Sequence, residues 1–249
     1  MTTTEFNNEF DLGYDNASKG APGLDMYEKS VLLTQAQEQI VKEAYSGYTP
    51  NRVSFEGSEK RRRQLSELVR DYKTISEITK FGGKPNTVDM SLIDSSQLFA
   101  LPLDLMYIIL EKVTLEGSSS QVTVKPVTHD EYNVNIGNPF KQPNKRRAWR
   151  LDLFKAGAIQ QAELFAIGTI TQYQIRYVKK PVPIILANFE SEAELQGLGL
   201  TVDGINNQTE CELNTEIHRD ILLRAIDLAV LQERENVLAN RINTNKMTI

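Results

Sequence analysis

The chain has 249 residues, of which 40% are hydrophobic and 24% are charged, and its formal net charge is −5. These values are typical of a folded globular protein with one large domain or two modest ones. The longest apolar run, residues 105–110, is too short to span a membrane, and the N-terminus has neither the basic nor the apolar region of a signal peptide.

Two helices are predicted in the first part of the chain. In residues 2–15, aromatic side chains recur every four residues on one face: Phe6, Phe10 and Tyr14. Gly13 makes this helix less favourable, because glycine has a low helix propensity. The second helix begins at Asp25, which can cap exposed amides while Glu28 reaches back to it, and continues to about residue 45.

A third helix is predicted from about Ser58. Four apolar residues follow the spacing of a helical seam: Leu65, Leu68, Tyr72 and Ile75. Glycine and proline in residues 82–86 then break the helical pattern, so this segment is the predicted boundary of the helical region.

The middle of the chain is rich in strand patterns. Strands are predicted from alternating side chains at residues 105–115, 121–125, 149–153 and 173–177. The first two form a hairpin, and Thr128 with Glu131 makes a capping box for a short helix. The last strand must end at Pro181, because proline cannot donate to a ladder. No element is predicted for residues 155–170.

A final helix is predicted from about Thr215 to about Ile242, because its apolar residues form one stripe. Since helices at both chain ends can pack together, we expect an α+β fold in which a helical core carries an inserted antiparallel β-rich domain. The predicted parts are the N-terminal part of the core (1–86), the β-rich insertion (87–186), the C-terminal part of the core (187–242) and a flexible tail (243–249).

Opposite charges are concentrated in different parts of the chain. Residues 57–73 contain six basic residues against three acidic ones, and residues 141–150 contain five basic residues and no acidic one. In residues 187–220 the balance reverses, with eight acidic residues against Arg219 alone. Such blocks either form solvated faces or join identical subunits head to tail.

No residue pattern predicts catalysis. His129 and His218 lie far apart and lack the spacing of zinc ligands, and His218 is expected to be exposed or next to a helix cap. The glycine pairs do not have the spacing of a phosphate-binding loop. Cys211 has no basic neighbour to stabilise a thiolate, and a single cysteine fits a reducing cytoplasm. We therefore expect no metal, no cofactor and no enzyme.

One pattern raises the question of nucleic-acid binding. Trp149, Tyr173 and Tyr177 lie among basic residues and could form a stacking platform for single strands. Strand alternation explains the same pattern with the aromatic residues facing inward and the cations outward. The acidic balance of the whole chain also opposes this use.

Nine short segments, in the same order along the chain, carry a resemblance to a known family. They are residues 10–12, 21–24, 27–30, 32–38, 101–105, 127–132, 138–140, 177–181 and 213–218. Together they resemble the head-to-tail connector adaptors of tailed bacteriophages, in particular the first ring protein below the portal in crAss-like phages. None of these segments is catalytic.

This resemblance implies a virion protein that is assembled in the host cytoplasm. Copies of the chain would form a closed ring, expected to be twelvefold, that contacts the portal and further ring or tail proteins but no membrane. Double-stranded DNA would pass through the bore without sequence-specific binding. By analogy with related adaptors, the C-terminal residues that would dock on the portal are Asn240, Arg241, Ile242, Lys246, Met247 and Ile249.

The charge blocks suggest how neighbouring subunits would join. The basic blocks would face the acidic stretch of the next copy, and reversing Arg61, Arg62 and Arg63 to glutamate would then impair ring closure. The interface candidates are Lys60, Arg61, Arg62, Arg63, Arg146, Arg147, Glu190, Glu192, Glu194, Glu210 and Glu212.

Three other interpretations of the sequence stay open. The chain could be another neck or tail component, such as a tail-tube completion or terminator protein, and a portal-docking C-terminus would separate the two. It could be a nucleic-acid-binding regulator that retains DNA at physiological salt. An enzyme would need a pocket in which His129 or His218 meets carboxylates.

Overall fold

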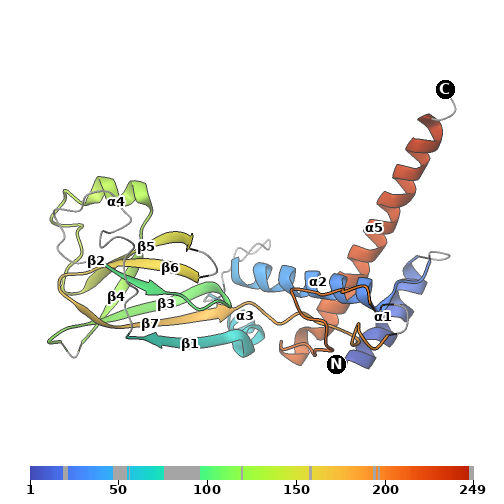
Figure 1. Ribbon diagram of the computed structural model, residues 1–249, viewed down its shortest axis with the longest axis horizontal. Coiled ribbons are helices and arrows are strands. Elements are labelled where there is room, and N and C mark those ends of the chain that lie inside the picture. The colour runs from blue at the N-terminus through green and yellow to red at the C-terminus, as the bar shows by residue number, and fades with distance from the viewer. Residues whose placement is uncertain are drawn as a thin grey trace. The chain divides into compact units, whose positions relative to one another are not determined.

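The computed structural model describes residues 1–18, 22–46, 55, 57–75, 96–118, 120–156, 159–192, 195 and 197–246, without the side chains of 153–159 and 235–246. The chain divides into two compact units (Figure 1). The helical unit consists of Met1–Leu68 and Pro181–Ile249, and the sheet unit consists of Val69–Lys180. Helices and a mostly antiparallel sheet confirm the α+β class.

Three long helices form the body of the helical unit: α1 (Thr3–Ala17), α2 (Met26–Ser46) and α5 (His218–Lys246). The unit also contains the short helix α3 (Glu59–Gln64) and the 3-10 helices η1 (Ser66–Leu68) and η3 (Thr215–Ile217). Helix α5 packs on both α1 and α2. No helix among the described residues is both long enough and apolar enough to span a membrane.

Local capping explains where α1 and α2 begin. Thr2 and Glu5 form a capping box at the start of α1, and Asp25 and Glu28 exchange the equivalent hydrogen bonds at the start of α2 (2.6 and 3.1 Å). The predicted aromatic face of α1, which consists of Phe6, Phe10 and Tyr14, is buried. Gly13 is tolerated in α1 because a Cβ there would meet the side chain of Ile226 on α5.

A row of buried polar side chains on α2 binds residues 182–186, where the chain re-enters the helical unit. Ser30 Oγ and Thr34 Oγ1 each accept a hydrogen bond from a backbone N–H of this segment at 3.1 Å. Gln37 Nε2 donates to a backbone carbonyl of the same segment at 2.8 Å. These bonds satisfy backbone groups that are removed from water.

The third predicted helix is wrong beyond its first turns. Helix α3 ends at Gln64, η1 follows, and strand β1 (Val69–Thr74) occupies the place of the predicted seam. Leu65 and Leu68 are fully buried, so their apolar spacing reflects the core of the helical unit. Valine, tyrosine and threonine favour an extended chain, and pairing with β7 overrides the helical spacing. The predicted boundary at residues 82–86 lies outside the described residues.

The sheet unit contains a seven-stranded sheet. Its strands are β1, β2 (Ser96–Ala100), β3 (Leu105–Leu115), β4 (Gln121–Pro126), β5 (Arg147–Ala156), β6 (Ile159–Phe165) and β7 (Ile170–Lys179), in the order β1-β7-β3-β4-β5-β6-β2. All neighbours pair antiparallel except β4 and β5, which are parallel. The β3–β4 hairpin and the end of β7 before Pro181 confirm the sequence prediction.

Two apolar clusters lie on opposite sides of strand β5. Ala148 belongs to the larger cluster, with Phe99, Val113 and Tyr173. Trp149 and its alternate neighbour Leu151 belong to the other cluster, which is covered by α4 (His129–Asn135) through Tyr132. Successive residues of β5 are therefore buried on both sides, and the strand has no solvent-facing side here.

A buried ion pair lies within the larger cluster. Arg150 Nη1 is 2.6 Å from Glu111 Oε1, and the Tyr173 hydroxyl donates a hydrogen bond to the same carboxylate oxygen. Burial and the neighbouring carboxylate both raise the pKa of Tyr173, so the phenol stays protonated. Arg150 forms a second ion pair with the mostly exposed Asp152, whose Oδ1 lies 2.9 Å from Arg150 Nε.

We expect Arg150→Ala to destabilise the sheet unit by about 3–5 kcal/mol, because Glu111 would remain buried without its cation. Urea unfolding followed by fluorescence measures this, since Trp149 is the only tryptophan and lies in the sheet unit. The matched control is Arg176→Ala, which removes an exposed pair with Asp71 and should cost less than about 1 kcal/mol. Equal effects of the two variants would contradict the expectation.

Candidate interaction surfaces

The part of the first basic block that holds the interface candidates, residues 60–63, lies on α3 in the helical unit. Lys60, Arg62 and Arg63 are exposed, and Arg61 is half-buried. Arg63 Nη2 lies 3.1 Å from Glu216 Oε1, so the basic block and the acidic stretch contact each other within a single chain. Both side chains are largely exposed, and such a pair contributes little to stability. Arg63 thus has an acidic partner in its own subunit.

The second basic block divides into different roles. Arg146 is exposed, whereas Arg147 is half-buried and donates to the backbone carbonyls of Phe140 and Lys141 at 3.4 and 2.9 Å. Arg150 is buried in the ion pair with Glu111. The charge of this block that faces solvent therefore comes from Arg146 and its neighbours, while Arg147 fixes a loop.

The acidic stretch lies in the helical unit, in a region with little regular secondary structure. Glu190 and Glu210 are exposed, and Glu192 is half-buried. Glu212 is also half-buried and accepts a hydrogen bond from the backbone N–H of Val182 at 3.2 Å. Glu194 lies outside the described residues. A small apolar cluster supports this region, with Ile185, Phe189, Leu195 and Val202 at its centre.

The C-terminal candidates lie on α5 and beyond it. The helix continues to Lys246, within the segment for which a tail is expected, so the backbone at Asn240, Arg241 and Ile242 is helical. The side chains of these residues are not described, and Met247 and Ile249 lie outside the described residues. Among the described side chains of α5, which end at residue 234, the last buried one is Ala229.

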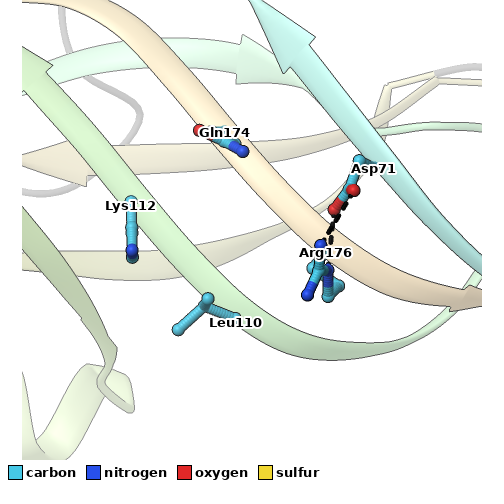
Figure 2. A pocket seen from close by; sticks show the side chains of 5 residues that line it. All are labelled: Asp71, Leu110, Lys112, Gln174 and Arg176. Carbon is cyan, nitrogen blue, oxygen red and sulfur yellow. Dashed lines mark hydrogen bonds and ion pairs between the residues drawn. The ribbon is translucent and has the colours of Figure 1, made fainter. Parts of the chain in front are cut away.

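A shallow recess of about 150 Å³ lies on the sheet unit, across β1, β7 and β3 (Figure 2). Arg176 Nε and Nη2 bind the carboxylate of Asp71 at 2.8 and 3.0 Å, and this bidentate contact lowers the pKa of Asp71. Leu110, Lys112 and Gln174 complete the lining. An ion pair that satisfies both charges leaves neither group available as an acid or a base.

The histidines and the cysteine do not form a common site in the described residues. His218 lies next to a helix cap, as one of the two sequence alternatives predicts, since it caps η3 and begins α5. It is buried and not exposed, because its ring packs against Phe6 and its Nε2 lies 2.8 Å from the carbonyl of Leu213. Burial lowers the pKa of His218. No group of three or more potential metal ligands occurs in the described part of the chain.

The possible stacking platform does not exist on the surface. Trp149, Tyr173 and Tyr177 are all buried, and Trp149 lies in a different cluster from the two tyrosines. The alternation argument holds for these aromatic residues but fails for Arg150, which faces inward and is neutralised by Glu111. Aromatic rings that are removed from solvent cannot stack on bases.

The chain thus consists of a helical unit and an inserted seven-stranded sheet, with exposed charged residues on both. The chain belongs to the family described as phage tail ring protein 3/4, whose model matches residues 1–241. It is 37% identical over 234 residues to "Ring protein 4/5" of Bacteroides phage crAss001, which covers 92% of each chain. It is 36% identical over 221 residues to "Ring protein 3" of the same phage, covering 85% of this chain and 87% of the relative. The protein is therefore a structural ring protein of a phage virion, as the resemblance in sequence predicts.

Burial raises the pKa of the Cys211 thiol to about 11. Because each pKa unit changes the thiolate fraction about tenfold, we expect Cys211 in the folded chain to react with iodoacetamide roughly a hundredfold more slowly than in the urea-unfolded chain at about pH 8. Mass spectrometry of the alkylated chain measures both rates. Equal rates would show that the thiol is accessible and ionised as in a free peptide.

Proposed function

We propose that this ring protein forms a closed ring, with twelve copies, in the neck that connects the portal to the tail. The observation that carries this proposal is membership of the ring protein family over almost the whole chain. Exposed basic residues on α3 and exposed acidic residues at Glu190 and Glu210 add support, because head-to-tail joints need two different surfaces on each copy. Assembly would take place in the cytoplasm of the host.

The charged surfaces would meet at the joint between neighbouring copies. The basic candidates Arg62 and Arg146 are exposed, as are Glu190 and Glu210 in the acidic stretch. Exposed charges of opposite sign accelerate encounter and fix the register more than they add affinity. In this arrangement the internal pair between Arg63 and Glu216 would align α3 with the acidic stretch within each copy.

The end of α5 would attach the ring to the component above it, which we take to be the portal. The described apolar contacts of α5 within the helical unit involve its first half, down to Ala229. The helix then continues to Lys246, and Figure 1 shows that this half extends beyond α1 and α2. The end of a helix that projects past its neighbouring helices can insert into a partner without disturbing the packing of the rest of its unit.

Double-stranded DNA would pass through the bore of this ring without sequence-specific binding. Lysines and arginines that contact phosphates hold DNA, whereas an acidic or mixed wall lets it slide. The net charge of −5 favours sliding.

A second position in the virion is favoured by the names of the relatives. They are called ring protein 3 and ring protein 4/5 in one phage. We therefore keep, as the second candidate, a ring that lies further along the tail and contacts other rings instead of the portal. The ring, the bore and the joint between copies would be the same in both positions, and only the partner of α5 would differ.

Native mass spectrometry of the purified chain, alone and mixed with the portal of the same phage, distinguishes the two positions. The first position predicts a discrete closed multimer that binds the portal and is lost from it when residues 240–249 are deleted. If the multimer binds a neighbouring ring protein but not the portal, the second position is correct. A chain that forms no multimer with either partner contradicts both.

Reversal of Arg62 and Arg146 to glutamate should reduce the fraction of closed rings, because both exposed charges would then repel the acidic stretch. Arg63 is left unchanged, since it pairs with Glu216 inside the subunit. The loss should be largest at low salt and shrink towards about 1 M, where the screening length is only about 3 Å. The matched control reverses Lys42 and Lys125, which are exposed and lie outside both basic blocks. Normal ring closure by the Arg62 and Arg146 variant would exclude this joint.

A further inference from the structure

The loop that follows α4 presents an aromatic side chain to solvent. Phe140 is 93% exposed, which is more than any other large apolar side chain that the structure describes. Val134 on α4 is also largely exposed, at 76%. Scattered exposed apolar residues are ordinary, but an almost fully exposed phenylalanine loses the benefit of burial and is common at protein interfaces.

This loop holds Phe140 in a fixed backbone conformation. Asn138 Oδ1 accepts a hydrogen bond from the Phe140 N–H at 3.0 Å, and Arg147 donates to the carbonyls of Phe140 and Lys141. Gln142 Nε2 donates to the carbonyl of Ile136 on the other side of the loop. Because the loop is ordered before it meets a partner, binding through Phe140 costs less conformational entropy.

The surroundings of Phe140 are basic. Lys141, Lys145 and Arg146 are exposed in the same loop, and residues 141–150 contain no acidic residue. A partner for this loop therefore needs an apolar recess of the size of an aromatic ring, with acidic side chains at its rim.

A groove with these properties lies in the helical unit. It has a volume of about 600 Å³ and is formed by α1, the start of α2 and α5. Its apolar and aromatic walls come from Tyr14, Leu24, Tyr27, Val31 and Leu32. Its charged lining residues among the described positions are both acidic, Glu28 and Glu233.

The groove also contacts the segment that leads into the acidic stretch. Tyr27 lines the groove and packs edge-on against Phe189, with ring centroids 5.5 Å apart. Phe189 immediately precedes the exposed Glu190. A basic loop seated in the groove would therefore have acidic side chains next to it on the surface of the same unit.

We propose that Phe140 of one copy inserts into this groove on the helical unit of the next copy. The inference rests on the proposed ring and specifies its joint: an apolar anchor in a recess, with Lys141, Lys145 and Arg146 facing acidic side chains. The loop and the groove are different surfaces of one chain, so the contact is heterologous. Such a contact closes a ring when the rotation between copies divides a full turn, as the proposed ring requires.

Cross-linking in assembled virions tests the joint. The phage carries Phe140→Cys and Val31→Cys in a Cys211→Ser chain, so that no native thiol remains. A short bis-maleimide should then give chain-to-chain multimers on denaturing gels. The variants with a single new cysteine should stay monomeric, and so should a control that combines Val31→Cys with Leu103→Cys, since Leu103 is 78% exposed elsewhere on the sheet unit.

A second measurement does not depend on cysteine variants. Phe140→Ser should reduce incorporation of the chain into rings by at least about tenfold, as expected for loss of an aromatic anchor, while Phe140→Leu retains most of it. Leu103→Ser, the exposed control, should assemble normally. Both Phe140 variants should fold, because the side chain is exposed.

The outcomes separate this joint from the ring itself. Electron microscopy of the same particles shows whether the chain is present as a ring. Rings that contain the chain but give no Phe140–Val31 multimer, or that tolerate Phe140→Ser as well as Leu103→Ser, overturn the joint and leave the ring intact. Absence of the chain from any ring contradicts the proposed function instead.

Discussion

The hydrogen bonds from Ser30, Thr34 and Gln37 to residues 182–186 determine how the helical unit is completed. The unit is made from two separate parts of the chain, and α2 is where the second part is bound on its return from the sheet. Buried backbone groups without partners are costly, so this segment has a strongly preferred register on α2. The position of α5, and the groove that it shares with α1 and α2, follow from that register.

The sheet unit depends on burial of a different kind. Arg150 and Glu111 are removed from water together, and the Tyr173 hydroxyl binds the same carboxylate. An ion pair of this kind adds little net stability compared with an apolar pair, but breaking it is expensive. It therefore favours one alignment of β3, β5 and β7, since a shift of one residue would leave a buried charge unpaired. The loop that carries Phe140, which we propose for assembly, therefore belongs to a sheet unit whose register is fixed by its interior.

Local signals in the sequence predicted much of this fold. Capping boxes at Asp25 and Thr128 and the aromatic spacing in α1 depend on near neighbours, so the sequence alone was sufficient. The predicted third helix failed because β1 depends on pairing with β7, more than a hundred residues away. Strand β2 was missed because its partner β6 is distant in sequence. Strand β6 pairs with the preceding strand β5, and it was missed because its residues lack clear alternation.

The candidate surfaces were predicted less completely than the elements. Charge blocks can be counted in the sequence, but only the fold shows that Arg147 fixes a loop while Arg150 is buried. The exposure of Phe140 could not be predicted, because an isolated phenylalanine between turns is more often part of a core. The groove is formed by α1 and α2 from the N-terminal part of the chain and α5 from the C-terminal part, so no local sequence pattern can predict it.

The sheet unit begins and ends at paired positions, since Val69 lies opposite Val178 on neighbouring strands. A segment whose two ends meet can be lengthened, replaced or diversified by mutation while the surrounding fold remains intact. Bacteroides phage crAss001 carries two relatives of this chain at nearly equal identity, 37% and 36%. An insertion of this kind allows one helical unit to carry different sheet surfaces without any change in its own core.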